Sequence, residues 1–219
     1  SPNNGRENQL RLFARRLRDV GIRWQREPRW SQIAHDVAVN DFRMSVEKSV
    51  NNRPSIKMEK WIAEGEFLTD TDTVKFTYIN RNGKSINKKR GIRPDGFFII
   101  LDYLRPIKGS PARARYLLEL DNSTHPLDRF GKEKAIAGLA YIRSQAYKNR
   151  FNFNSGRWLI VCVSPQRMIN LKKQTEKVLN NDAKYFLFTT LDQATPEKIF
   201  SAPIWIRGGA STPDRLITT

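Results

Sequence analysis

The chain has 219 residues, of which 39% are hydrophobic, so it is long enough to bury the core of one large domain. Its 39 Lys and Arg residues against 22 Asp and Glu give a formal net charge of +17 at pH 7. Because no run of eighteen apolar residues and no signal-peptide pattern occurs, we expect no membrane-spanning segment. A surplus of this size repels itself in a compact state, and a polyanionic partner, DNA above all, is the usual explanation.

The first part of the chain predicts helices before strands. Residues 6–19 combine leucines and arginines at helical spacing, which predicts an amphipathic helix, and residues 22–30 are irregular. A longer helix is expected over about 31–50, and the run Asn51-Asn52-Arg53-Pro54 ends it. A short strand with a loop and then an alternating strand follow, around residues 56–68 and 74–80.

After residue 80, strands alternate with helices. Residues 81–93 hold six basic residues and no acid, and Asn82-Gly83 among them indicates a hairpin turn. Helices are expected over about 126–147, where Pro126 fits the first turn, and over about 165–180. Short apolar runs predict strands at 96–101, 116–120, 158–164 and 185–189. This order predicts an α/β fold with a mixed sheet and helices on its faces.

Two smaller expectations concern the cysteine and the end of the chain. Cys162 is the single cysteine and lies in an apolar run, so it cannot form an internal disulfide and is expected in the core. A reducing, cytoplasmic compartment is the natural setting. Residues 206–219, rich in Gly, Ser, Thr and Pro, are predicted to be a disordered tail.

Basic residues gather in two segments, 81–93 and 143–157, and Phe151 and Phe153 lie within the second. Cations interleaved with aromatic rings suit phosphate contact and base stacking. A membrane surface would instead favour a basic amphipathic helix, whereas the densest cluster here is a hairpin loop. The candidate DNA-binding residues are Arg81, Lys84, Lys88, Lys89, Arg90, Arg93, Arg143, Lys148, Arg150 and Arg157.

Three acidic residues stand at the ends of neighbouring predicted strands. Asp95 opens one strand, and Glu119 and Asp121 close the next, where residues two apart point to the same face. Converging carboxylates repel one another unless a cation lies among them, and Mg²⁺ or Mn²⁺ prefers such oxygen ligands. The pattern indicates metal-dependent phosphodiester hydrolysis. The alternative is that these acids only terminate strands and cap the following turn.

A lysine near the attacking water usually completes this chemistry, but Asp121 occupies its place in the strand. Lys134 shares the inward stripe of the next helix with Phe130 and Tyr141, so it is the candidate to reach over the end of the sheet. Glu47, on the polar stripe of the first long helix, is a further candidate acid or water-mediated ligand.

Several segments resemble the replication-relaxation family of bacterial plasmids and integrative elements. They are Ala34–Arg43, Trp61–Glu64, Arg93–Asp95, Leu118–Asp121 and the continuation Asn122–Leu127 with Lys134 and Tyr141. The resemblance covers about residues 30–190 and implies a divergent PD-(D/E)xK, restriction-endonuclease-like fold. It also implies that Asp95 and Glu119 are metal ligands, Asp121 an accessory ligand and Lys134 a relocated catalytic lysine.

The resemblance further implies a domain organisation and a setting. Family members commonly begin with a winged-helix domain, and no full one precedes residue 30 here. We therefore expect residues 1–30 to be a basic helical extension or a remnant, and residues 31–205 to be the nuclease-fold domain. The expected partners are plasmid or mobile-element DNA and a relaxase or replication-initiation protein, in the bacterial cytoplasm.

Two functions stay open: a Mg²⁺-dependent endonuclease or nickase, and a non-catalytic DNA-binding accessory factor. A tyrosine relaxase with a histidine-bound metal needs a close histidine pair, and the chain holds only His35 and His125. No P-loop or dinucleotide-binding glycine pattern occurs. The oligomeric state and the preference for duplex or single strands leave no mark in the sequence.

Overall fold

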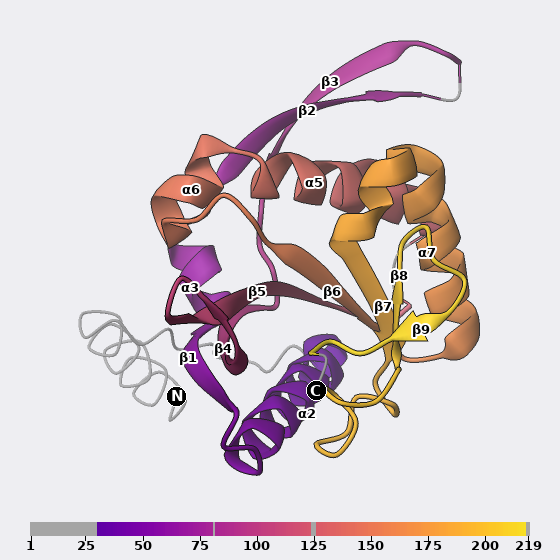
Figure 1. Ribbon diagram of the computed structural model, residues 1–219. Coiled ribbons are helices and arrows are strands. Elements are labelled where there is room, and N and C mark those ends of the chain that lie inside the picture. The colour runs from indigo at the N-terminus through magenta and orange to yellow at the C-terminus, as the bar shows by residue number, and fades with distance from the viewer. Residues whose placement is uncertain (1–29, 81, 124–125, 218–219) are drawn as a thin grey trace, which may run out of the picture. The chain divides into compact units, whose positions relative to one another are not determined.

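The structure is a computed structural model that describes residues 30–80, 82–123 and 126–217 (Figure 1). The helix expected over 6–19 therefore lies outside the described residues, as does Arg81. The chain forms two compact units, residues 1–37 and 38–219, and helix α2 (Trp30–Asn51) begins in the first and ends in the second. No helix within the described residues has the length and apolar character needed to cross a membrane.

Strands of the second unit form one mixed sheet. Among the described residues it has seven strands, in the spatial order β1 (Ile56–Ala63), β4 (Gly96–Ile107), β5 (Ser110–Asp121), β6 (Arg157–Cys162), β7 (Phe186–Thr190), β8 (Trp205–Arg207) and β9 (Pro213–Asp214). The strands β5, β6 and β7 are parallel, and the other neighbours are antiparallel. The expected mixed α/β class is confirmed. The parallel strands bring their carboxyl ends to one edge of the sheet.

Both faces of the sheet are covered, because alternate residues of a strand point to opposite sides. Phe97, Leu117 and Ile160 belong to a cluster under α5 (Ile136–Ile142), α6 (Gln145–Phe151) and α7 (Pro165–Leu179). Phe98 and Leu118 belong to a second cluster, to which α2 contributes Phe42 and Val46. Figure 1 shows α5 and α7 on one side of the sheet and α2 on the other. Burial on both faces explains why the strands read as continuous apolar runs.

The helix expected over 126–147 is broken, which corrects the sequence prediction. It divides into α4 (Leu127–Arg129), a π-helical turn η1 (Phe130–Ala135), α5 and α6. The break before α6 occurs at Ser144, whose backbone is extended and whose hydroxyl accepts a hydrogen bond from the Tyr147 amide at 3.1 Å. A serine cap of this kind starts a new helix. The apolar spacing continues across the break, so it could not reveal it.

The basic segment after residue 80 forms the predicted hairpin. Its strands β2 (Thr73–Ile79) and β3 (Ser85–Gly91) form a separate antiparallel pair that extends beyond α5 (Figure 1). The carboxamide of Asn80 accepts hydrogen bonds from the amides of Asn82 and Lys84 at 2.9 Å, and Gly83 takes a φ of +74°. Glycine adopts this left-handed conformation without strain, which fixes the turn. Val74 and Phe76 anchor the hairpin in the first cluster.

The C-terminal segment corrects a second prediction. Its composition predicts a disordered tail over residues 206–219, but the chain is ordered through Ile217, the last described residue. Strand β9 pairs with β8, and Leu216 and Ile217 are buried in the second cluster. Small and polar residues dominate this segment, so its composition hides the two apolar side chains that hold it. Cys162 is a buried free cysteine in the core, as predicted.

The remaining elements are short or lie as expected. The segment after β1 forms α3 (Glu64–Thr69), and η2 (Asn180–Tyr185) joins α7 to β7. Helix α7 begins at Pro165 after the cap Ser164, whose hydroxyl accepts from the Arg167 amide at 3.3 Å. The sequence prediction placed this helix within one residue of its observed end. Proline in the first turn and serine before it are the sequence signs of such a start.

Candidate functional site

Asp95 and Glu119 lie side by side on neighbouring strands. Gly96 of β4 pairs with Leu118 of β5, which sets Asp95 opposite Glu119, and the Asp95 amide donates to the Leu118 carbonyl at 2.9 Å. Both residues follow the alternation of the first cluster, so both side chains point toward the face that η1 covers. They are 7% and 8% exposed, respectively. The sequence placed Asp95 with Glu119 and Asp121 on the condition that the two strands pair side by side, and the register meets that condition for Asp95 and Glu119.

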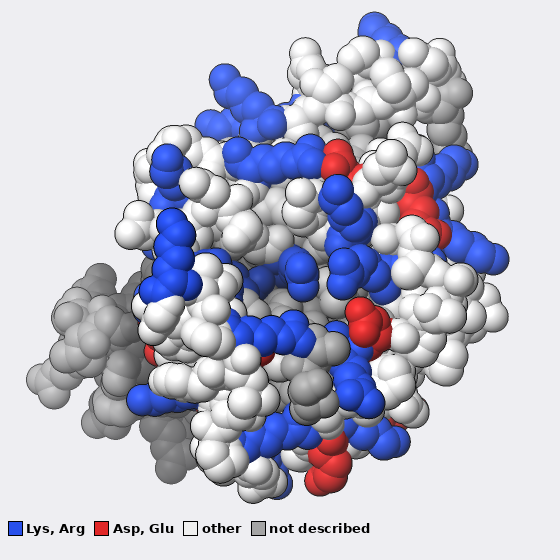
Figure 2. All heavy atoms as spheres, viewed as in Figure 1, with Lys and Arg blue, Asp and Glu red and all other residues white. Residues whose placement is uncertain are grey.

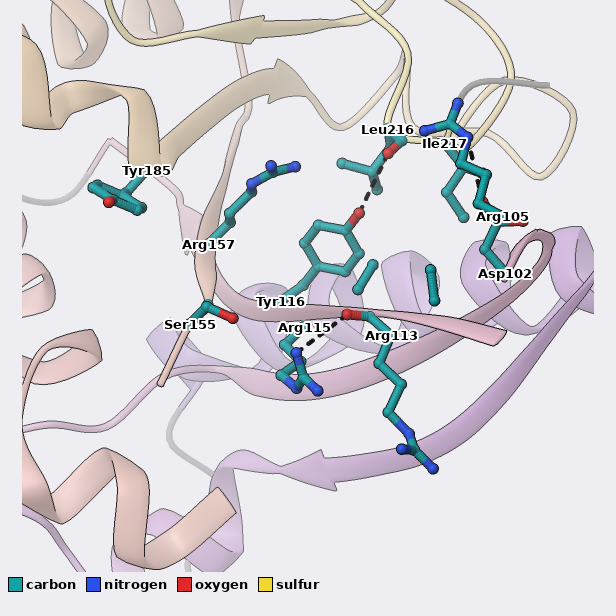
Figure 3. Close-up of a pocket in the computed structure, with 13 residues that line it drawn as sticks. Asp102, Arg105, Arg113, Arg115, Tyr116, Ser155, Arg157, Tyr185, Leu216 and Ile217 are labelled. Carbon is teal, nitrogen blue, oxygen red and sulfur yellow. Dashed lines mark hydrogen bonds and ion pairs between the residues drawn. The ribbon is translucent and has the colours of Figure 1, made fainter. Parts of the chain in front are cut away.

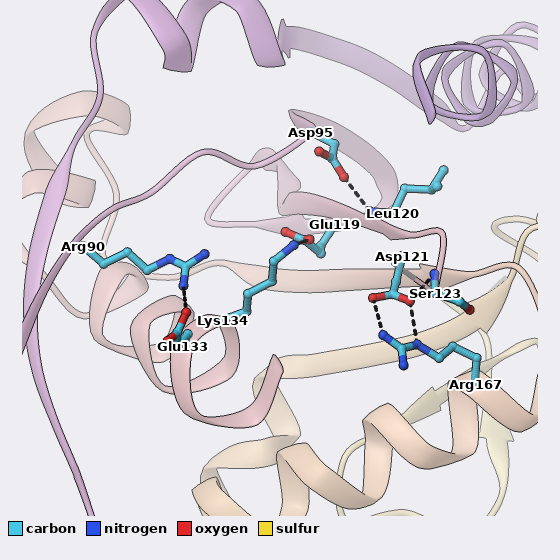
Figure 4. A network of polar contacts seen from close by, with 9 residues as sticks. All are labelled: Arg90, Asp95, Glu119, Leu120, Asp121, Ser123, Glu133, Lys134 and Arg167. Carbon is cyan, nitrogen blue, oxygen red and sulfur yellow. Dashed lines mark hydrogen bonds and ion pairs between the residues drawn. The ribbon is translucent and has the colours of Figure 1, made fainter. Parts of the chain in front are cut away.

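Lys134 reaches Glu119 from the helical layer. Its Nζ donates to Glu119 Oε1, and Figure 4 shows the side chain extending from η1 to the strand. The proximity expected from helical spacing is thus confirmed. The π-helical turn was not predicted, and such turns are rare and often lie at functional sites. It sends neighbouring residues to different partners, because Lys134 turns to the sheet while Glu133 turns to the β2–β3 hairpin.

Burial and charge act against each other at Glu119. Burial is the largest influence and raises the pKa of Glu119, the Lys134 ammonium lowers it, and Asp95 raises it again, so that the pKa comes to about 7. Burial also disfavours the charged form of Lys134, but the Glu119 carboxylate outweighs this and raises the pKa of Lys134. Lys134 therefore stays a cation, and the site holds a positive charge next to a carboxylate that gains or loses its proton near neutrality.

The Asp95 carboxylate is also hydrogen-bonded to the backbone of the neighbouring strand β5. Its Oδ2 accepts a hydrogen bond from the Leu120 amide at 2.6 Å. This bond points the carboxylate along the strand beside Glu119, as Figure 4 shows. A fixed carboxylate of this kind loses little conformational entropy when it takes up a cation.

Asp121 has a different cation from the one expected. Its carboxylate is held by Arg167 of α7 in a two-pronged ion pair, with Nε–Oδ1 2.7 Å and Nη2–Oδ2 3.1 Å (Figure 4). Oδ1 also accepts from the Ser123 amide at 2.9 Å. The Asp121 side chain is 3% exposed and that of Arg167 12%. The structure therefore gives Asp121 a buried guanidinium partner instead of placing it with Lys134.

Glu47 lies on the other side of the sheet from Glu119. It belongs to α2, whose Phe42 and Val46 pack in the second cluster. Its Oε1 accepts from Arg43 Nε at 2.7 Å, four residues earlier on the same helix. The structure thus pairs Glu47 with Arg43 and does not bring it to the face of Asp95 and Glu119.

Glu133 joins the hairpin to the helical layer. It accepts from Lys88 at 3.0 Å, from Arg90 at 3.1 Å and from Arg129 at 3.0 Å. Its burial is outweighed by the hydrogen bonds from Lys88 and Arg129, which lower the pKa of Glu133 to about 2. The carboxylate is therefore ionised at neutral pH and ties β3 to η1 beside the Lys134 site.

The candidate DNA-binding residues fall into two groups. Several are ion-paired: Lys88 and Arg90 with Glu133, Arg143 with Asp182, and Arg150 with Asp70 and Asp72. Others are exposed and have no carboxylate partner among the described residues; they are Lys84, Lys89, Lys148 and Arg157. Arg93 is exposed and donates to the Thr71 hydroxyl at 3.3 Å. On the face drawn in Figure 2, Lys and Arg side chains cover more of the surface than Asp and Glu side chains do.

The aromatic residues of segment 143–157 do not offer stacking faces, which corrects another expectation. Phe151 is 8% exposed and stacks on Phe97 with ring centroids 3.9 Å apart. Phe153 packs against the same cluster, and Arg115 covers its ring at 3.3 Å. Phe151 lies on the inward face of α6, and Phe153 follows the end of that helix and is partly buried against the same cluster.

Arg167 and Glu133 were not predicted from the sequence. Arg167 follows the cap Ser164 within one turn, at the carboxyl end of β6. Since β5 and β6 are parallel, the first turn of α7 meets the end of β5, where Asp121 stands. The order of strands and helices is the signal that could have indicated this pairing. Lys88 and Arg90, two of the partners of Glu133, come from a hairpin more than forty positions away, and no local pattern indicates these two pairings.

A bound Mg²⁺ would fit Asp95 and Glu119 with help from the substrate. Among the described residues, no group of three or more His, Cys, Asp and Glu side chains is arranged as a metal site. Mg²⁺ is often held by one or two carboxylates together with substrate phosphates and water. Asp95 and Glu119 match that donor set, whereas Asp121 is occupied by Arg167.

The chain was compared with known proteins in three ways. No protein-family model matches it, and neither the curated proteins nor the solved structures contain a match.

Proposed function

We propose that this protein is a metal-dependent DNA endonuclease or nickase of mobile-element DNA, with a restriction-endonuclease-like core. The observation that carries the proposal is the juxtaposition of Asp95, Glu119 and Lys134. Two carboxylates on adjacent strands with a lysine within reach form the acidic and basic parts of a PD-(D/E)xK site. The lysine comes from η1, since Asp121 stands in the strand position. The resemblance to the replication-relaxation family gives the same assignment.

The roles of these residues follow from their contacts. When bound, Mg²⁺ supplies Lewis-acid stabilisation of the phosphate and lowers the pKa of a water molecule. Asp95 and Glu119 would hold it, with Asp95 oriented by the Leu120 amide. Lys134 keeps a positive charge beside Glu119, where it can stabilise negative charge that develops on the phosphate. Arg167 neutralises Asp121, so that one carboxylate fewer repels the approaching DNA.

The positive surface supports DNA as the substrate. Asp95 and Glu119 are an acidic pair in a chain of net charge +17. Exposed cations of the hairpin, Lys84 and Lys89, lie on the element that Glu133 ties to η1. Cations placed around a small acidic site hold the phosphates that flank the one to be cut.

A plasmid-nicking assay tests the proposal. Supercoiled plasmid incubated with the protein and Mg²⁺ or Mn²⁺ should be converted to the open-circular form, and EDTA should stop the conversion. Asp95→Asn, Glu119→Gln and Lys134→Met should each lower the rate by about a hundredfold or more, as expected when charge stabilisation of a transition state is removed. Asp102→Asn is the matched control, because Asp102 is a buried acid of β4 away from this site.

Two results would contradict the proposed endonuclease activity. Nicking that survives in Asp95→Asn and Glu119→Gln would come from a contaminant, and absence of nicking in the wild type under both metals would leave the protein without this activity. DNA binding measured on the same samples separates a failure of the reaction from a failure to bind the substrate.

The second candidate is a non-catalytic DNA-binding factor that acts beside a relaxase or replication initiator. One observation favours it: each carboxylate of the site already has a protein partner, namely Lys134, Arg167 or the Leu120 amide. In that case wild type, Glu119→Gln and Lys134→Met would bind DNA equally in the presence and absence of Mg²⁺, and none would nick it.

A further inference from the structure

A second basic site lies at the opposite end of the parallel strands. Strand β5 begins at Ser110, but β6 pairs with it only from Tyr116 onward. The edge of β5 before Tyr116 is therefore left without a β6 neighbour, and a cavity of about 300 Å³ occupies that place. Arg115 and Glu119 are four residues apart on β5, roughly 13 Å at strand spacing, so the cavity is separate from the Lys134 site.

Charge is the main property of this cavity. The described residues that line it include Arg105, Arg113, Arg115 and Arg157 against the single acid Asp102, a net charge of +3. Part of this charge has protein partners, since Arg113 is held by Glu59 at 3.0 Å and Arg105 Nε lies 3.9 Å from Asp102 Oδ2. The positive charge that remains is carried by Arg115 and Arg157.

Arg115 is half-buried with its guanidinium over the Phe153 ring, and one of its nitrogens has no hydrogen-bond acceptor in the described part of the chain. Its Nε is buried without a hydrogen-bond acceptor among the described residues, and its Nη1 donates only to the Arg113 carbonyl at 3.2 Å. Burial lowers the pKa of this guanidinium, which marks a cation that is incompletely compensated. A buried donor without an acceptor costs free energy, and a ligand that supplies the acceptor recovers it.

Arg157 faces the same hollow from the start of β6. It is exposed and has no carboxylate partner among the described residues. Figure 3 shows Arg157 and Arg105 on either side of the Tyr116 ring, with Leu216 at the Tyr116 hydroxyl and Tyr185 beyond Arg157. The Tyr116 hydroxyl donates to the Leu216 carbonyl at 3.3 Å, which ties the C-terminal segment over the cavity. Arg157 and Arg105 thus lie beside apolar Leu216 on one face of β5, while Arg115 lines the cavity from the other face of the strand.

We propose that this cavity binds the phosphate of a nucleotide, either a free mononucleotide or the terminal nucleotide of a DNA strand. Guanidinium groups match the planar, two-pronged acceptor geometry of phosphate. The volume lies at the lower end of the range for small-molecule sites and suits one nucleotide rather than a long polymer. Apolar Leu216 and Ile217 can cover the sugar and base. The proposal stands apart from cleavage at Glu119, because it needs none of that site's residues.

Calorimetric titration with thymidine 5′-monophosphate tests the proposal. The full chain should bind this nucleotide at one site, and thymidine, which has no phosphate, at least about tenfold more weakly. Arg157→Gln, at an exposed position, should weaken binding of the nucleotide about tenfold, and Arg115→Gln with Arg157→Gln further still. Lys177→Gln, an exposed lysine of α7, is the control of equal charge change and should leave the affinity unchanged.

The outcomes distinguish a free nucleotide from the end of a DNA strand, and they keep nucleotide binding distinct from the proposed nicking activity. Competition by a 5′-phosphorylated oligonucleotide, but not by its unphosphorylated form, identifies a DNA strand end, and a lack of competition by either identifies a free nucleotide. Equal affinity for thymidine and its monophosphate, or full affinity in both arginine variants, overturns the proposal. Glu119→Gln should keep nucleotide binding whatever its effect on nicking, so failure of one proposal leaves the other testable.

Discussion

At the scale of single residues, the site is a set of compensated buried charges. Glu119 and Lys134 neutralise each other, and Asp121 forms a second pair with Arg167 two positions further along the same strand. Removing one member of a buried pair leaves its partner without compensation, which costs far more than the pair itself contributes. Glu119 can lose its buried charge by taking up a proton, because its pKa is raised to about 7.

Lys134→Met should therefore extend the pH dependence of stability to higher pH, because Glu119 already has a pKa of about 7 in the wild type. Without the ammonium, burial and Asp95 hold the pKa of Glu119 still higher above its ordinary value. A carboxyl group whose folded-state pKa is raised favours folding while it is protonated, and this contribution is lost as pH rises toward that pKa. In metal-free buffer, urea unfolding of Lys134→Met should lose stability by about 1.4 kcal/mol per pH unit from pH 5 to 7. Adding Glu119→Gln should abolish this slope, and a slope that persists would refute the assignment.

At the scale of elements, the β2–β3 hairpin carries a cluster of basic residues and is joined by ion pairs to η1, the turn that carries Lys134. It is anchored by Val74 and Phe76 in the core and by Glu133, which binds Lys88 and Arg90. Part of its positive charge is therefore neutralised within the protein. The exposed Lys84 and Lys89 have no carboxylate partner among the described residues. A two-stranded ribbon of this kind has the dimensions to follow a DNA groove.

Replacing Lys84 and Lys89 by Gln should weaken DNA binding without affecting folding. Each lysine that no longer neutralises a phosphate reduces the slope of log affinity against log salt by about 0.9, so the double variant should reduce this slope by about 2. Fluorescence anisotropy with a labelled duplex at several salt concentrations measures it. Lys173→Gln with Lys177→Gln, two exposed positions of α7, is the matched control. An equal reduction in both pairs would mean that the hairpin has no special part in binding.

At the scale of the whole second unit, stability depends on a sheet with a hydrophobic layer on each face. The second layer includes residues from both ends of this unit, since Phe42 and Val46 of α2 share it with Leu216 and Ile217. The C-terminal segment is thus part of the core, and it also forms one wall of the arginine-lined cavity. Its removal should affect both folding and that cavity.

Leu216→Ala with Ile217→Ala should lower the free energy of unfolding by about 2 kcal/mol for each residue, toward the low end for buried aliphatic truncations. Both side chains are 8% exposed, so little water occupies their place in the native state. Urea unfolding followed by tryptophan fluorescence measures the change. Thr212→Ala, at an exposed position of the same segment, should have almost no effect. A double variant as stable as the wild type would show that this segment is not part of the folded core.

Local patterns in the sequence predicted much of the fold. The helix over 31–50, the strand runs and the hairpin at Asn82-Gly83 follow from apolar spacing and turn chemistry, which depend on neighbours in the chain. Strand alternation and helical spacing also indicated that Glu119 and Lys134 point inward, but the pairing of β4 with β5 and the π-helical turn at Lys134 came only from the structure. The break at Ser144 and the order of the C-terminal segment did not, because apolar spacing continues through the first and composition hides the second.

By itself, the sequence determined the class of fold, the surplus of positive charge and the inward direction of Glu119 and Lys134. Only the tertiary structure decided which charges remain available to a partner. Asp121 meets Arg167 across 46 positions and Lys88 meets Glu133 across 45, so each pair forms only when the elements pack. The arginine-lined cavity exists because β6 begins later than β5 beside it, a matter of strand register. Contacts between distant segments depend on the packing of whole elements, and no local pattern carries that information.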